Sequence, residues 1–296
     1  MRVSTMNNFF FDFKEGKESY LESTIKTNEA GFKVMDFCMC PMQRNETELN
    51  GENWKYLVDR IANEAAKRGI EFSQSHLPYA KWKGEDPTLE GYEKNEWFIE
   101  TTKRCIEISG MLGVKWAVVH PVTERKYITD PERNLAYNHE IFDKYVEQAS
   151  KLGVGLAFEN MADIEGNRRY GATANDLCAI VDSYNSEYVG ACWDFGHANL
   201  QESERGHAED FKMIVDKIKI LHVDDNHACE DRHLAPGFGT AKFDELLPIL
   251  FRSGFDGFFN MECNIPLRNP EITDLYCEAM VHCAKILIKE SGGTVD

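Results

Sequence analysis

The sequence lacks any apolar run that approaches the ~20 residues a helix needs to cross a bilayer. Its first residues, MRVSTMNNFFFDFKEG, also lack the basic region, apolar core and small-residue cleavage site of a secretory signal peptide. No segment of low complexity interrupts the chain, so we expect one domain over residues 1–296 rather than units joined by a linker. These absences argue against a membrane protein and favour a globular, cytoplasmic one.

A disulfide framework is also absent. The nine cysteines are scattered and odd in number, and several lie inside apolar strand-like or helical segments. This pattern is typical of reduced, buried thiols in a cytosolic protein. The cysteines in such segments are Cys105, Cys178, Cys192, Cys263 and Cys283.

Basic residues are outnumbered by acidic ones. The formal net charge is −17, from 33 Lys and Arg against 50 Asp and Glu. Proteins that bind nucleic acid usually present a basic stripe that neutralises phosphates. Here the basic residues are interspersed with acids, and the one tight cluster near a candidate site is Arg168-Arg169. A nucleic acid is therefore not the expected partner.

Strand-like and helical patterns alternate along the whole chain, and several helical segments stop at a glycine such as Gly69, Gly113 or Gly153. The expected strands are Val3–Met6, Phe32–Met39, Ile70–His76, Val114–His120, Val154–Asn160, Val189–Asp194, Ile218–Val223 and Asp256–Cys263. The expected helices are Glu15–Ala30, Asn53–Arg68, Tyr92–Leu112, Asn134–Leu152, Thr173–Tyr184, Glu204–Lys217, Phe243–Ser253 and Pro270–Lys289.

Such alternation predicts a parallel sheet with right-handed crossovers. Eight strand–helix units in ~250 residues or slightly more predict an α/β fold of the (β/α)₈ TIM barrel type. A doubly wound open sheet is the competing interpretation, but no Gly-rich phosphate fingerprint follows the first strand.

Metal-type side chains gather where the expected strands end, which is where the active site of such a barrel lies. Five of the nine histidines fall on this rim. The third to sixth strands end in His76, His120, Glu159 and Asp194, and His197 follows the sixth; the seventh ends in His222, with Asp231 and His233 in its loop, and the eighth ends in Glu262.

Four of these residues come from four successive strands, so their side chains can converge on one point inside the rim. They are Glu159, Asp194, His222 and Glu262. Three carboxylates and one imidazole form an oxygen-rich site suited to Mn²⁺, Mg²⁺, Co²⁺ or Zn²⁺. The sequence therefore predicts a divalent-metal site.

These strand endings resemble those of the xylose isomerase-like TIM barrel superfamily, which includes sugar isomerases and epimerases, dehydratases and the AP endonuclease family 2 enzyme endonuclease IV. As a fold, the resemblance covers nearly the whole chain. The motifs that carry it are Ser75-His76, His120-Pro121, Phe158-Glu159-Asn160, Asp194-Phe195-Gly196-His197, His222-Val223-Asp224 and Asp231-Arg232-His233 with Pro236-Gly237-x-Gly239.

The resemblance implies a metal-dependent isomerase or epimerase of a small sugar or sugar derivative. In the sugar-active members, the positions matching the four predicted ligands bind one metal that stabilises an enediolate. The positions matching Glu159 and Glu262 also move protons, and the one matching His197 contacts substrate. Independently of the resemblance, Arg168 and Arg169 in the loop after the fifth strand either hold a phosphate or carboxylate of the substrate or belong to a solvated loop. A dehydratase is a variant in which the enediolate expels a hydroxyl instead.

Endonuclease IV is the alternative that the resemblance also implies: a zinc phosphodiesterase acting at abasic DNA sites. Its second metal would use His76 and His120 with Glu159 bridging, and its third His197, Asp231 and His233. The loop Asn160–Glu165 and the form Trp-Asp-Phe-Gly-His around Asp194 depart from that enzyme. All nine of its zinc-ligand positions have a counterpart of ligand type here, in His76, His120, Glu159, Asp194, His197, His222, Asp231, His233 and Glu262.

The expected partner is thus a small sugar, without nucleic acid or membrane, and assembly into a homo-oligomer is left open. Tyr79 and Trp82, in the loop after the third strand, either cover an apolar face of the sugar or pack against the barrel.

Overall fold

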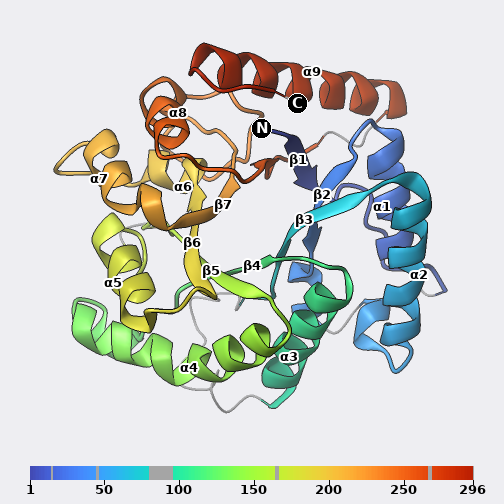
Figure 1. The fold of residues 1–296 in the computed structure, drawn as a ribbon, viewed down its shortest axis with the longest axis horizontal. Coiled ribbons are helices and arrows are strands. Elements are labelled where there is room, and N and C mark those ends of the chain that lie inside the picture. The colour runs from blue at the N-terminus through green and yellow to red at the C-terminus, as the bar shows by residue number, and fades with distance from the viewer. Residues whose placement is uncertain (15, 45–46, 80–95, 164–166, 266–268, 296) are drawn as a thin grey trace.

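A computed structural model describes residues 1–14, 16–44, 47–79, 96–163, 167–265 and 269–295. Its eight parallel strands follow the order β7-β6-β5-β4-β3-β2-β1-β8 and form a ring with the helices outside it, as Figure 1 shows. A parallel bridge between Val223 and Met261 joins the two ends of this sheet. The predicted (β/α)₈ TIM barrel is therefore confirmed.

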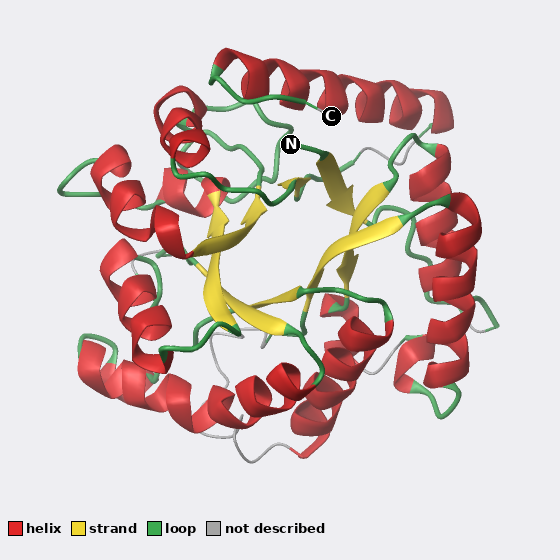
Figure 2. Cartoon of the chain, viewed as in Figure 1, coloured by secondary structure: helices red, strands yellow, loops and turns green. Residues whose placement is uncertain are grey.

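The helices and strands alternate along the chain, and Figure 2 separates the inner strands from the outer helices. The strands are β1 (Val3–Met6), β2 (Val34–Cys38), β3 (Glu71–His76), β4 (Trp116–Val119), β5 (Gly155–Glu159), β6 (Val189–Asp194), β7 (Ile218–His222) and β8 (Phe259–Met261). The helices are α1 (Ser19–Glu29), α2 (Trp54–Arg68), α3 (Glu96–Met111), α4 (Pro131–Lys151), α5 (Ala174–Tyr184), α6 (Phe195–Leu200), α7 (His207–Ile214), α8 (Phe243–Arg252) and α9 (Pro270–Glu290).

Some expected boundaries are wrong and one helix is unexpected, and capping or strand pairing explains two of these boundaries and the added helix. Helix α4 begins before Asn134, because Asp130 accepts a hydrogen bond from the Arg133 amide at 2.9 Å and Pro131 suits a first helical turn. Strand β8 begins at Phe259, the residue paired with Val3 at the start of β1. Helix α6 is not predicted at all; Asp194 caps it through the His197 amide at 2.6 Å.

The interior of the barrel has an apolar half and a polar half. Four buried side chains from β4 to β7 form the apolar half: Val118, Ala157, Cys192 and Ile220. In the polar half, the carboxylate of Asp36 accepts a hydrogen bond from Gln74 at 2.9 Å and another from Asn260 at 3.3 Å. The larger core lies between the strands and the surrounding helices.

None of the nine cysteines, all within the described ranges, forms a disulfide. Among the helices of those same ranges, none has both the length and the apolar character needed to span a membrane.

Candidate metal centre

The period of two along a strand places the site residues directly above the interior layer. His76 follows Gln74 by two positions, as Glu159 follows Ala157 and His222 follows Ile220. The same step leads from Val118 to His120, from Cys192 to Asp194 and from Asn260 to Glu262. The six side chains therefore enter the carboxyl end of the barrel because that face of each strand is its inner face.

Glu159, Asp194, His222 and Glu262 form a compact group, with one potential ligand atom from each within 4.8 Å of all the others. The His222 Nδ1 atom lies 2.9 Å from Glu159 Oε1 and 2.7 Å from Glu262 Oε2. Asp194 Oδ2 is 3.9 Å from the same nitrogen. The four predicted ligands are thus brought together at one point.

This group has the properties of a cation site. Three carboxylates surround one imidazole, and Glu159, Asp194 and His222 are buried. Asp194 Oδ2 is buried and has no hydrogen-bond partner in the part of the chain that the structure describes. Buried carboxylate oxygens are costly unless a hydrogen-bond donor or a cation satisfies them. The donor set of oxygen and nitrogen atoms fits a divalent ion such as Mn²⁺, Mg²⁺, Co²⁺ or Zn²⁺.

The electrostatics of the group also favour positive charge. Burial raises the pKa of Glu159, but the imidazoles of His222 and His120 outweigh burial and hold the pKa well below its usual range. Burial lowers the pKa of His76, and the carboxylates of Glu159 and Glu262 reverse this effect and raise the pKa to about 9. In both cases a neighbour of opposite charge stabilises the charged form: the imidazoles stabilise the Glu159 carboxylate, and the carboxylates stabilise the His76 imidazolium.

His76 and His120 form a second group around the other oxygen of Glu159. His120 Nε2 lies 2.8 Å from Glu159 Oε2, and His76 Nε2 lies 3.6 Å from it. The Tyr79 ring stacks on the His120 ring with centroids 4.4 Å apart. Tyr79 therefore packs against a site histidine, whereas its predicted companion Trp82 lies outside the described residues.

His197, Asp231 and His233 form a third group at the outer edge of the centre. Asp231 Oδ2 lies 3.5 Å from His197 Nε2 and 3.4 Å from His233 Nε2. The remaining ring nitrogens are held by backbone carbonyls, since His197 Nδ1 is 2.9 Å from Asn160 O and His233 Nδ1 is 2.9 Å from Glu262 O. All nine ligand-type residues predicted from the sequence therefore meet in one region.

A cavity of about 500 Å³ opens beside these groups, within the usual range for small-molecule sites. His76, His120 and Glu159 line it, together with residues from the other two groups. The two predicted substrate-binding arginines differ in their position relative to this cavity. Arg169 lines the cavity, whereas Arg168 pairs with Asp176 and lies 3.5 Å from Asp163.

Sequence reasoning assigns no role to three residues that lie against the ligands, although two of them, Asn160 and Asp224, stand in the motifs named above. Asp36 Oδ2 lies 3.5 Å from His222 Nε2, on the far side of the ring from Glu159 and Glu262. The Asn160 side chain accepts from the Asp194 amide at 2.6 Å and donates to the Asp194 carbonyl at 2.9 Å. Asp224 accepts from the Gly196 amide at 3.1 Å. Only the strand period marks Asp36 in advance, as an inner-face carboxylate.

Gly196 is required by this packing. A Cβ atom there would lie 2.2 Å from Asp224 Oδ2, closer than such contacts allow. Gly196→Ala should therefore lower the free energy of unfolding by about 1–3 kcal/mol. Gly110→Ala, in helix α3, is the control: its Cβ would lie 3.4 Å from the Leu152 side chain, and a helical alanine is worth up to ~1 kcal/mol over glycine. Urea unfolding of both variants tests this, and equal stabilities would contradict it.

The chain is similar to several known proteins. An inosose isomerase from Bacillus licheniformis is 31% identical over 196 residues, which are 63% of this chain and 66% of the relative. A probable endonuclease 4 from Acholeplasma laidlawii is 28% identical over 166 residues, 52% of this chain and 55% of the relative. A solved D-tagatose 3-epimerase-like protein has a TM-score of 0.72 and 22% identity, with 98% of this chain and 99% of that one covered.

At 22% identity the structural likeness establishes the fold alone, and the chain spans about half the length of the first curated relatives it matches. The family described as "Xylose isomerase-like TIM barrel" matches residues 26–278. Since this match covers most of the chain, the protein belongs to the xylose isomerase-like TIM barrel family.

Proposed function

We propose that this protein is a metal-dependent isomerase or epimerase of a small sugar or sugar derivative. The observation that carries the proposal is the pairing of two glutamates at one centre: Glu159 and Glu262 lie 2.9 and 2.7 Å from the same nitrogen of His222 and line the same cavity. Two carboxylates at one centre can divide the removal and the return of a proton at a carbon between them. Relatives named as an inosose isomerase and a tagatose epimerase-like protein support the same class.

Glu159, Asp194, His222 and Glu262 would hold the divalent ion. When bound, the ion would supply Lewis-acid polarisation of two adjacent substrate oxygens. The proton chemistry belongs to the protein: one glutamate accepts the proton from the carbon beside the carbonyl, and the other returns a proton to the neighbouring position or opposite face. His197, on the cavity wall with its Nδ1 fixed by a backbone carbonyl, presents Nε2 for a substrate hydroxyl.

The test is conversion of ketoses by the purified protein. A panel of ketohexoses, ketopentoses and inososes, free and phosphorylated, is followed by NMR with Mn²⁺, Co²⁺, Zn²⁺ or Mg²⁺ added and then after chelation. We expect one substrate group to be isomerised or epimerised, with activity lost on chelation and restored by metal. Loss of water from a substrate in the same assay would identify a dehydratase instead.

A second function is favoured by a specific observation. The additional groups of His76 with His120 and of His197 with Asp231 and His233 supply the donors that an endonuclease IV-like site with several zinc ions would need. The formal net charge of −17 opposes binding to DNA. Cleavage of a duplex carrying one abasic site, compared with the intact duplex, separates this function from sugar chemistry.

The position of Asp36 leads to a prediction about the affinity for the ion. The Asp36 carboxylate lies 3.5 Å from His222 Nε2, on the side of the ring opposite the cluster. If it orients that ring, Asp36→Asn should weaken ion binding by roughly 10–100-fold, as for other residues that orient metal ligands. The measurement is metal affinity by competition with a chromophoric chelator. Asp216→Asn, in the turn before β7, is the matched control and should leave the affinity unchanged. An unaltered affinity in Asp36→Asn would exclude this role.

A further inference from the structure

Arg168 and Arg169 are neighbours in sequence but have different surroundings. The guanidinium of Arg168 pairs with Asp176, lies 3.5 Å from Asp163 and donates to the carbonyl of Arg169. In contrast, no hydrogen bond or ion pair from any described residue reaches the guanidinium of Arg169, which lines the cavity. Arg168 therefore stabilises the loop, and Arg169 is the arginine available to a ligand.

Hydrogen bonds anchor the backbone at Arg169. Its amide donates to Asp163 Oδ1 at 2.8 Å, and the next amide, of Tyr170, donates to Thr123 Oγ1 at 2.7 Å. The Gly171 amide then donates to Asp176 Oδ2 at 3.3 Å, the carboxylate that also binds Arg168. A backbone that is anchored, with a side chain that no described residue pairs, is the arrangement of a ligand-binding residue, since the fold fixes the base of the side chain.

The charge of Arg169 is unusual for its place. Burial lowers its pKa, and the carboxylates of Asp231 and Asp163 act in the opposite direction. A partly buried guanidinium has lost some of its hydration, and no hydrogen bond from the described part of the chain compensates for that loss. A bidentate oxyanion is the partner that matches its planar set of donors.

The same cavity borders the metal centre. Arg169 lines it together with His197, Glu159 and Glu262, so one bound molecule can contact both the arginine and the proton-transfer residues. Elsewhere the cavity is unfavourable to an anion, because the carboxylates of Asp231, Glu159 and Glu262 also line it. An anionic group on the substrate would therefore be directed to the arginine, and the substrate would be held in one orientation.

We propose that Arg169 binds a phosphate or carboxylate group of the substrate, so that the enzyme acts on sugar phosphates or sugar acids in preference to neutral sugars. This inference rests on the proposed function for the identity of the reaction, but the anion site itself can be tested without turnover.

The first experiment measures binding of inorganic phosphate and of acetate to the full-length protein by calorimetry, with ionic strength held constant by chloride. The wild type should bind at least one of the two anions, and Arg169→Gln should weaken that binding by about tenfold or more, as expected for loss of a charge-assisted bidentate contact. Arg169→Lys, which keeps the charge but not the planar fork, should lose less.

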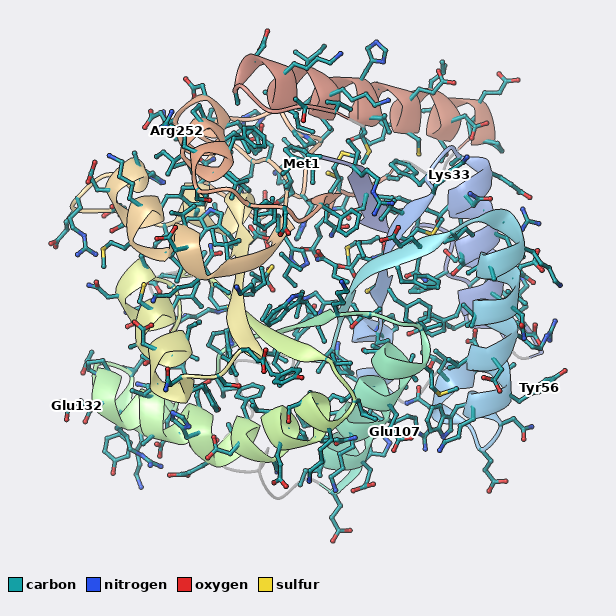
Figure 3. All side chains as sticks on the ribbon, in the orientation of Figure 1. Met1, Lys33, Tyr56, Glu107, Glu132 and Arg252 are labelled. Carbon is teal, nitrogen blue, oxygen red and sulfur yellow. The ribbon has the colours of Figure 1, made fainter. Side chains whose placement is uncertain are left out.

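The matched control is Arg252→Gln, which makes the same change in net charge on the exposed outer side of α8, where Figure 3 labels it. It should bind the anions as the wild type does. If phosphate binding survives in Arg169→Gln, the anion sits elsewhere, for example on an ion in the carboxylate group, and the proposal is wrong. Failure of both anions to bind the wild type would overturn it equally.

The second experiment compares kcat/KM for matched neutral, phosphorylated and carboxylated ketoses. The anionic member should be preferred by the wild type, and Arg169→Gln should remove that preference chiefly through KM. The more favoured anion identifies the substrate as a sugar phosphate or a sugar acid. Absence of all sugar turnover would count against the proposed function, whereas the calorimetry judges Arg169 independently. Turnover with equal preference for neutral sugars would contradict the role of Arg169.

Discussion

Glu262→Gln is expected to lower sugar turnover by about 10²–10⁴-fold while the protein stays folded with its site assembled. An amide is nearly the same size as the carboxylate and can still offer an oxygen to an ion, but it cannot accept a proton. The residue directly follows β8, with its Oε2 atom 2.7 Å from His222 Nδ1. Initial rates at saturating substrate and saturating metal provide the measurement.

Two checks accompany this variant. Metal content must be measured beside activity, because the substitution also removes one negative charge from the ligand group. Glu132→Gln makes the same chemical change on the exposed surface of α4, where Figure 3 labels the residue, and should retain full activity. A fully metallated Glu262→Gln protein with wild-type turnover would show that Glu262 moves no proton.

His222→Ala is expected to abolish binding of the ion and to lower the activity by more than about 100-fold. Substitution of residues that only orient metal ligands already lowers metal affinity or activity by about 10–100-fold. His222 is fully buried between Asp36 on one side and Glu159 with Glu262 on the other, and it supplies the one imidazole of the four-residue group. Its loss would leave that group with carboxylates alone. Elemental analysis of protein purified without added metal should give an ion in the wild type and none in the variant.

The control for this experiment is His282→Ala on the exposed face of α9, which should keep the wild-type metal content. The number of metal ions per chain also distinguishes the two proposed functions. One ion per chain agrees with the sugar enzyme, whereas two or three zinc ions that disappear in His120→Ala or His233→Ala would favour the phosphodiesterase. Retention of the ion by His222→Ala would place the metal centre elsewhere.

The barrel and its rim could be predicted from the sequence because both depend on local patterns. Strands alternate with helices, so a parallel barrel follows, and residues at strand ends then lie at one end of it. Glu159, Asp194 and His222 each end a strand in the structure as predicted. His120 and Glu262 fall one residue beyond β4 and β8, which leaves their inner-face position unchanged.

What could not be predicted depends on contacts between distant segments. The short β8 is bounded by its pairing with β1, about 256 residues away in sequence, and helix α6 begins where the Asp194 carboxylate caps it. Asp36 carries no local sign of its contact with His222. Likewise, the sequence treats Arg168 and Arg169 alike, and only the fold assigns one to Asp176 and the other to the cavity.

The central claim is that this protein moves a proton at a carbon beside a carbonyl, and the most direct test is solvent exchange. Purified protein with metal is incubated in D₂O with the ketose that it converts, and deuterium is located by NMR and mass spectrometry. We predict deuterium at the carbon next to the carbonyl in the product, at a rate that falls with Glu262→Gln. Cleavage of abasic-site DNA, with neither deuterium incorporation nor isomerisation for any sugar in the panel, would contradict the account.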